Sequence, residues 1–226
     1  AYGQGFSPAS LFSSGEEGGW YDPSDLTKVF QPDGTTPTVP WISGDILDAN
    51  RVGKLVDKSG NGNDLVQTTL TKCPALKLVG GLYFLEFDGV DDGLQSAAIN
   101  FTGTNTFRLA SINGNVWRYS SKGTSGVNAS ATGYTPPVTS VLTGLSDIAN
   151  DVTTIRVDGV QKASLATDQG TGSFGDYPLN LGARNNGTLL HLEGKVYGFI
   201  VRGALSNASE IASTEAYIAG KTGVSI

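Results

Sequence analysis

The hydrophobic residues of this chain gather in short runs separated by glycine-rich polar stretches, a pattern typical of strands joined by turns. The densest run, Leu82 to Phe87, reads LYFLEF and lies between Gly80-Gly81 and Gly89. It is shorter than a typical helix and rich in aromatic side chains, so it predicts a buried β-strand. We expect the fold to be organised around this strand.

Further apolar runs predict strands at a spacing of about 8 to 12 residues, which is typical of a β-sandwich. Three joins carry Asn-Gly or Asp-Gly pairs that supply the positive φ of two-residue hairpin turns: Asn113-Gly114, Asp158-Gly159 and Asn186-Gly187. The predicted strands are Val52–Asp57, Asp64–Thr69, Thr106–Ile112, Val116–Ser120, Val138–Leu142, Thr153–Val157, Gln161–Leu165, Pro178–Leu181, Leu189–Leu192 and Lys195–Arg202.

Two segments have helical signals instead. Asp22 suits an N-cap, and the proline and the i, i+3, i+4 apolar residues that follow predict a short helix over Pro23–Phe30. Asn207 and Glu210 form a capping-box pair ahead of an apolar stripe. This pair predicts a C-terminal helix at about 207–219.

Length and composition fit one β-rich domain. The chain has 226 residues, of which 31 are glycine. A single hydrophobic core in a domain of this length can be stable without disulfide bonds or bound metal ions. The first residues are rich in glycine and serine. We therefore expect an arm or linker over 1–15 and a single domain over 16–226.

Charge and motifs exclude several classes of function. The net charge is −6, and the 15 Lys and Arg residues are spread thinly, which disfavours binding to nucleic acid. No apolar window is long enough to predict a transmembrane helix, so we expect no membrane insertion. One cysteine excludes an intrachain disulfide, and no nucleophile elbow or phosphate-binding loop occurs. We expect a protein that is not an enzyme.

The acidic residues after the central run are the first candidate site. Asp88, Asp91 and Asp92 crowd three carboxylates around Gly89, where they could bind a cation or accept hydrogen bonds from turn amides. Glu86 and Asp88 leave the same strand face, and closely spaced carboxylates are the catalytic pair of retaining glycosidases. A glycosidase acting on polysaccharide is therefore a further alternative.

A second polar segment lies upstream. Asp57, Ser59 and Asn61 place oxygen-bearing side chains at alternate positions before Gly62, as in the first half of a calcium loop. The twelfth position is Thr68 instead of glutamate, so the segment is not an EF-hand. Two interpretations of the segment therefore remain: a hydrogen-bonded Asx turn and a metal site.

Two side chains outside these segments, Trp41 and His191, are considered for ligand binding or catalysis. Trp41 lies in a proline-rich loop and is a candidate for stacking on a sugar ring. His191, the only histidine, alternates with leucines and is expected on a strand, facing solvent.

Five segments follow one another along the chain: DKSGNGN at Asp57–Asn63, LEFDGVDDGL at Leu85–Leu94, IRVDGVQKAS at Ile155–Ser164, PLNLGARNNG at Pro178–Gly187 and LEGKVYGFIVRGALSNASEIA at Leu192–Ala212. In this order they resemble the concanavalin A-like, laminin-G-like jelly-roll family. A lead-in at Ser7–Leu26 and a close at Glu215–Val224 are similar to the form of this domain found in bacteriophage tail and virion proteins.

The resemblance implies a fold and a function. The fold is a two-sheet antiparallel jelly-roll β-sandwich with a short N-terminal and a C-terminal helix. The function is that of a virion component, in a tail fibre, spike or capsid fibre, that binds a host-surface glycan beside other virion proteins and forms a homotrimer. A purely structural, decorative role is the alternative. The resemblance also implies a structural calcium ion, with candidate ligands Asp57, Asn61, Asn63, Asp88, Asp91 and Asp92.

Overall fold

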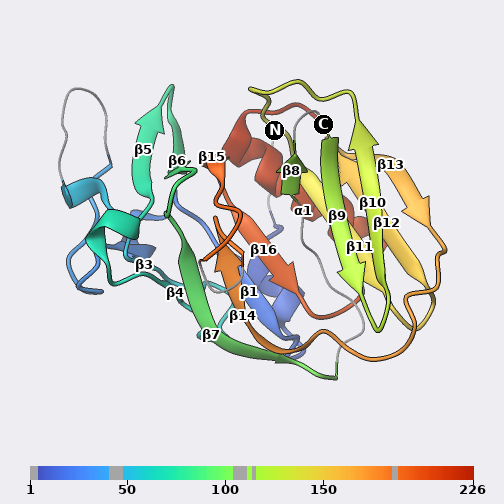
Figure 1. Cartoon of the computed structure of the whole chain (residues 1–226). Helices are drawn as coiled ribbons and strands as arrows, with labels where there is room; N and C mark the ends of the chain where they lie inside the picture. Colours follow the sequence, from blue (N-terminus) through green and yellow to red (C-terminus); the bar gives the residue numbers. More distant parts are fainter. Residues whose placement is uncertain (1–4, 41–47, 104–110, 114–115, 185–187) are drawn as a thin grey trace. The chain divides into compact units, whose positions relative to one another are not determined.

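The computed structural model describes residues 5–40, 48–103, 111–113, 116–184 and 188–226, and it is mostly β (Figure 1). The strands form several antiparallel sheets, and one α-helix closes the described chain, as the sequence predicts. The strands are β1 Gly18–Tyr21, β2 Val29–Phe30, β3 Lys54–Leu55, β4 Leu65–Val66, β5 Ala75–Val79, β6 Leu82–Asp88, β7 Leu94–Phe101, β8 Ser111–Asn113, β9 Val116–Lys122, β10 Gly126–Thr132, β11 Leu142–Asp147, β12 Val152–Val157, β13 Val160–Leu165, β14 Gly175–Leu181, β15 Glu193–Val196 and β16 Phe199–Arg202. The helices are α1 Ala208–Thr222 and the short 3₁₀ helices η1 Pro8–Phe12, η2 Leu26–Lys28, η3 Asp48–Asn50 and η4 Leu70–Lys72.

The chain divides into two compact units, each made of segments distant in sequence. The first unit comprises Ala1–Gly18, Asn100–Asp176 and Val201–Ile226. The second unit comprises Gly19–Ile99 and Tyr177–Ile200. Each change of unit falls inside a strand, namely β1, β7, β14 or β16.

The first unit contains two three-stranded sheets that share a core. Their strand orders are β10-β9-β8 and β11-β12-β13. Tyr119 and Ala129 of one sheet cluster with Ile155 and Val157 of the other, all of them fully buried. Gly144 on β11 lies under the ring of Tyr119, where a Cβ would approach the ring atom Cδ2 to 2.1 Å. The two sheets therefore pack through a large ring that fits because the facing position has no side chain.

The C-terminal helix belongs to the first unit and begins where the sequence predicts. The Asn207 side chain accepts from the Glu210 backbone N–H at 2.9 Å, and the Glu210 carboxylate accepts from the Asn207 N–H at 2.8 Å. These reciprocal bonds confirm the predicted capping box. The helix ends at Gly223, with φ 73°, a few residues later than predicted. Its Glu215 is buried and holds Arg156 of β12 in a two-pronged ion pair at 2.7 and 3.0 Å.

The beginning of the described chain also packs within the first unit. Leu11 and Phe12 of η1 are buried, and η1 contacts α1. Arg202 donates to Glu16 at 2.7 Å and to Glu210 at 3.1 Å, which ties this segment to the start of α1. The predicted boundaries, an arm over 1–15 and one domain over 16–226, stay a prediction.

The second unit contains a five-stranded sheet, ordered β14-β7-β4-β3-β2, and a three-stranded sheet, ordered β15-β6-β5. The central apolar run of the sequence is β6, as predicted, and its Phe84, Leu85 and Phe87 are buried. In the five-stranded sheet, Leu55 of β3 and Leu65 of β4 are buried, whereas their strand neighbours Lys54 and Val66 reach solvent. This alternation defines a core face and an outer face of the sheet.

The helix predicted over Pro23–Phe30 is wrong. Only Leu26–Lys28 is helical there, as the 3₁₀ turn η2, and Val29–Phe30 is strand β2. The Asp22 carboxylate accepts from the Ser24 N–H at 3.0 Å, which closes an Asx turn instead of starting an α-helix. Pairing of β2 with β3 then extends the chain, a long-range contact that local periodicity does not encode.

The predicted strand over Leu189–Leu192 is also wrong. Leu189 makes an isolated bridge with Arg184, and Leu190 has φ 50°, which is incompatible with an extended strand. The Leu192 N–H donates to Gly182 at 2.7 Å, outside any named strand. His191 therefore lies in a loop and not on a strand.

Elsewhere the predicted strands are shifted, split or missed. The run Val138–Leu142 precedes its strand, since β11 begins at Leu142. The run Lys195–Arg202 divides into parts of β15 and β16. Strands β1, β5, β7 and β10 were not predicted. Two of them, β7 and β10, are rich in Ala, Ser and Asn, which are weak strand signals. Residues 106–110 of the predicted strand Thr106–Ile112, Gly114 of the first predicted hairpin turn and both residues of Asn186-Gly187 lie outside the described residues. The third, Asp158-Gly159, has φ 50° and 76° as predicted.

Replacing Gly144 tests the sheet-on-sheet core. We expect Gly144→Ala to lower the free energy of unfolding by about 1–3 kcal/mol, because the added methyl group overlaps the Tyr119 ring. Gly126→Ala is the matched control, since a Cβ there meets nothing within 4 Å. Urea unfolding followed by circular dichroism measures both. Equal stability of the two variants would contradict this account of the core.

Candidate functional site

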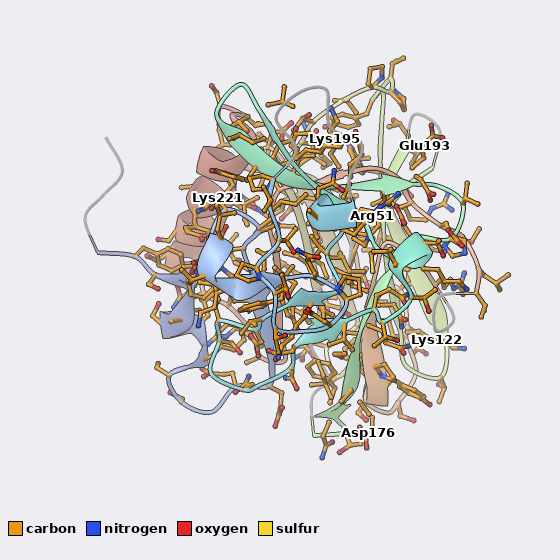
Figure 2. All side chains as sticks on the ribbon, turned by 90° about the vertical axis from the view of Figure 1, so that its left-hand side faces the viewer. Arg51, Lys122, Asp176, Glu193, Lys195 and Lys221 are labelled. Carbon is orange, nitrogen blue, oxygen red and sulfur yellow. The ribbon has the colours of Figure 1, made fainter. Side chains whose placement is uncertain are left out.

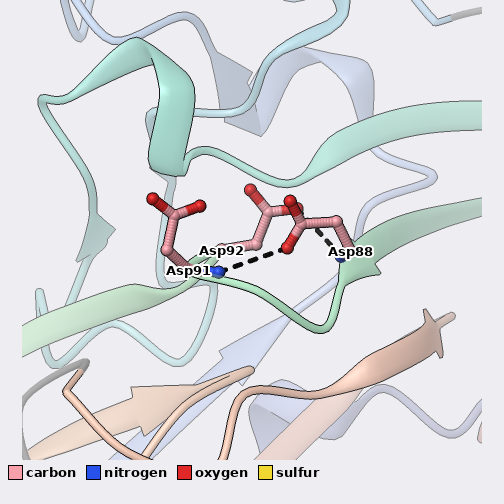
Figure 3. Close-up of side chains that lie close together, drawn as sticks. All are labelled: Asp88, Asp91 and Asp92. Carbon is pink, nitrogen blue, oxygen red and sulfur yellow. Dashed lines mark hydrogen bonds between the residues drawn. The ribbon is translucent and has the colours of Figure 1, made fainter.

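The acidic turn, residues Asp88–Asp92, joins β6 to β7 in the second unit (Figure 3). Gly89 has φ 77°, and a Cβ there would lie 2.9 Å from the Cβ of Glu193 on β15. The Gly89 N–H donates to the Leu192 carbonyl at 3.0 Å. Glycine therefore provides both the backbone conformation and the close approach to the neighbouring segment.

Carboxylates of the turn hold its own backbone. Asp88 Oδ1 accepts from the N–H groups of Val90 at 2.8 Å and Asp91 at 3.3 Å. Asp92 Oδ2 accepts from the Asp88 N–H at 3.1 Å, and Figure 3 shows this bond beside the one from Asp91. Two of the three side chains are therefore Asx-type caps, as the hydrogen-bonding alternative expected.

Asp92 is the buried member of the cluster. It is 1% exposed, and its Oδ1 has no hydrogen-bond donor. The nearest cation is Arg51, which follows η3 and is labelled in Figure 2; its Nη1 lies 3.7 Å from that oxygen. The same nitrogen donates to the Cys73 carbonyl at 2.7 Å. Arg51 therefore offsets the negative charge of Asp92 by proximity, whereas the hydrogen bond from its Nη1 is donated to the Cys73 carbonyl.

Burial and neighbouring charge shift the two carboxyls in opposite directions. Loss of hydration, followed by repulsion from Asp88, raises the pKa of Asp92 to about 6. Asp88 also loses hydration, but backbone N–H donors and Arg51 outweigh that loss and hold its pKa below the ordinary value. Because the folded pKa of Asp92 lies above that of an unfolded aspartate, ionising Asp92 lowers stability as pH rises from about 4 to 6.

The cluster has the dimensions of a cation site. One carboxylate oxygen from each of Asp88, Asp91 and Asp92 lies within 4.8 Å of the other two. Two oxygens at calcium-ligand distance from one ion, about 2.3–2.6 Å each, are separated by no more than about 5 Å. Among the described residues, this is the one group of three or more Asp, Glu, His or Cys side chains that meets such a limit.

The upstream motif forms a loop around one carboxylate. Asp57 is buried, and its Oδ1 accepts from the N–H groups of Trp20 at 3.0 Å and Ser59 at 2.8 Å. Its Oδ2 accepts from the Ser59 hydroxyl at 2.7 Å and the Asn63 N–H at 3.0 Å. These four donors match the four lone-pair sites of a carboxylate. The arrangement is that of an Asx turn extended by contacts with β1.

The two asparagines of that motif have backbone roles. The Asn61 N–H donates to the Ser59 hydroxyl at 3.2 Å, and the Asn63 carbonyl accepts from the Tyr21 hydroxyl at 2.5 Å. Asp57 is not part of the carboxylate group of the acidic turn. Metal ligation by Asp57, Asn61 and Asn63 stays a prediction that rests on the resemblance.

Three other residues of interest in the described part of the chain, Glu86, His191 and Cys73, do not belong to the carboxylate group of Asp88, Asp91 and Asp92. Glu86 forms an ion pair with Lys77 at 3.4 Å and lies opposite Lys195 on β15. His191 Nδ1 lies 3.5 Å from the Asp92 carbonyl. Burial raises the pKa of Cys73 to about 12, so its thiol is not poised for reaction. Trp41 lies outside the described residues.

Sequence reasoning missed Arg51 and the contact between Trp20 and Asp57. Neither belongs to a motif, and each meets its carboxylate across a long stretch of chain. An apolar or charged pattern within one segment gives no signal for such contacts. The turn-forming aspartates were detectable because their partners lie within a few residues.

Comparison with protein-family models, curated proteins and solved structures finds no match for this chain. In the described ranges, none of the helices has the length and apolar character needed to cross a membrane.

Removing the Asp57 carboxylate tests its structural role. We expect Asp57→Ala to lower the free energy of unfolding by about 2–4 kcal/mol, because the buried N–H group of Trp20 and the partly buried N–H group of Asn63 lose a charged acceptor. Asp33→Ala is the matched control: Asp33 also accepts from two backbone N–H groups, those of Thr35 and Thr36, but on the surface. Thermal and urea unfolding measure the difference, and a larger loss for Asp33→Ala would contradict the assignment.

Proposed function

We propose that this chain is a non-enzymatic bacteriophage virion component whose lectin-like jelly-roll domain binds a glycan on the host cell surface. The observation that carries the proposal is the ordered series of five family-like motifs that starts at Asp57. The antiparallel, β-rich architecture with a C-terminal helix is compatible with it. In this proposal the two-sheet sandwich, the virion location and the homotrimer all follow from the same resemblance.

The described geometry also favours binding over catalysis. Glu86, the residue on which a glycosidase depends, is engaged by Lys77, and Asp88 is occupied by turn amides. The pKa of Asp88 is lowered by its backbone N–H donors, whereas a general acid near neutral pH needs a raised pKa. The acidic composition is unsuited to phosphate-rich partners but compatible with sugar hydroxyls.

Glycan binding is tested on an array of bacterial capsular polysaccharides and O-antigens. We expect the purified chain to bind a small subset of the array, because hydroxyl recognition by fixed polar groups is selective. Immunogold labelling of purified particles with an antibody to this chain checks the virion location. Binding to no glycan, combined with labelled particles, would favour the purely structural alternative and contradict the lectin proposal.

A calcium ion on Asp88, Asp91 and Asp92 is part of the same proposal. The residues fit a hard cation in two respects: their carboxylates converge, and Asp92 Oδ1 lacks a hydrogen-bond donor. Calcium would offset the loss of hydration and the repulsion from Asp88 that raise the pKa of Asp92. Arg51 opposes this fit, because its guanidinium already supplies positive charge to the cluster.

Calcium removal decides between an ion and a turn held by internal hydrogen bonds. We expect millimolar calcium to raise Tm relative to chelator at pH 7.5, and to raise it less at pH 5, where protonated Asp92 competes with the ion. Asp91→Asn should abolish the calcium response, whereas Asp33→Asn, a surface Asx-turn control, should keep it. An unchanged Tm with calcium at pH 7.5 would exclude the ion and leave the turn interpretation.

A further inference from the structure

A continuous row of side chains crosses the outer face of the five-stranded sheet in the second unit. Strand register places Phe30 beside Lys54, Lys54 beside Val66, and Val66 beside Gln95. Gln95 Nε2 then donates to Asn180 Oδ1 on β14 at 3.0 Å. We call these five residues the outer row.

The outer row turns away from the core. The residues next to it on the same strands, Val29, Leu55 and Leu65, are almost fully buried, while Val66 is 43% exposed. The other members of the row are half-buried. Along each strand, residues of the outer row alternate with buried residues, and the sheet holds the backbone of the row in place. A preorganised surface suits recognition, because little conformational freedom is lost on binding.

The row is polar but carries no unpaired charge. Its one cation, Lys54, forms an ion pair with Asp64 at 2.9 Å. Asn180 donates one amide N–H to the Pro178 carbonyl at 3.3 Å and accepts once from Gln95. By the hydrogen-bonding capacity of an amide, Asn180 retains one N–H and one lone pair for a ligand.

These features match an uncharged sugar better than a charged partner. A hydroxyl is both donor and acceptor, which complements an amide that retains one of each. The apolar side chains of Val66 and Phe30 can cover the C–H face of a sugar ring. With the Lys54 charge neutralised, the row attracts neither acidic sugars nor basic peptides over distance.

We infer that the outer row is a subsite for a neutral glycan, contacted by the Asn180 amide and by the apolar surface of Val66 and Phe30. The inference rests on the proposed lectin function and assigns it a place within the described residues. None of its five residues belongs to the acidic turn, so the outer-row variants test the subsite separately from the calcium proposal.

The test compares variants on the polysaccharide array used above. We expect Val66→Glu to weaken binding to the neutral glycans that the parent protein recognises by about tenfold or more, because it puts a charge at the centre of the row. Asn180→Ala should weaken it several-fold through the lost amide. The matched controls lie in the first unit: Val160→Glu at an exposed valine, and Asn128→Ala at an exposed amide bonded to Ser120 at 2.6 Å. Both should bind within about twofold of the parent protein.

The outcomes separate this inference from the function on which it rests. Circular dichroism and Tm first establish that each variant is folded. If the parent protein binds glycans and the outer-row variants bind them equally well, the subsite assignment is wrong and the lectin function stands. If the parent protein binds no glycan, the lectin function fails and the subsite with it. Selective loss in the outer-row variants alone supports the subsite.

Discussion

The hydrogen bonds accepted by the buried Asp57 carboxylate hold the junction between β1 and the loop that follows β3. The carboxylate gathers donors from Trp20 on β1, from Ser59 within its own loop, and from Asn63 at the end of that loop. Moving a carboxylate out of water costs free energy unless charged hydrogen bonds replace its hydration. Four such bonds do so here, and they fix where β1 meets the loop. The Lys58 N–H donates to the Trp20 carbonyl at 2.8 Å and reinforces the same junction.

The sequence predicted those parts of the fold whose causes are local. The apolar run of β6 and the capping box of α1 are examples, because each is complete within one segment. The helix expected over Pro23–Phe30 failed for the opposite reason. Asp22, the expected N-cap, accepts a hydrogen bond from the Ser24 N–H, and Asp25 accepts one from the Thr27 N–H. Strand β2 takes its extended conformation from pairing with β3. Pairing with a distant strand overrides a weak helical pattern.

The candidate site shows the same division. Asp88 and Asp92 were predicted to cap turn amides or to bind a cation, and the capping contacts are present. The burial of Asp92 and its approach to Arg51 could not be predicted, since they arise from packing of segments far apart in sequence. That packing decides the chemistry of Asp92, because on an open surface its carboxylate would keep the hydration whose loss raises its pKa. The outer row escaped prediction too, because strand register, and not spacing along the chain, brings Lys54, Val66 and Gln95 together.

The interleaving of the two units has a consequence for how such a chain can be cut and recombined. The first unit is made of three segments and the second of two, and each transition lies within a strand. A truncation before β14 therefore removes strands from both units at once, and neither unit can be transplanted as one contiguous fragment. Insertions, by contrast, are best placed in loops internal to one unit, such as the glycine turn between β5 and β6, where Gly80 and Gly81 have open space around them.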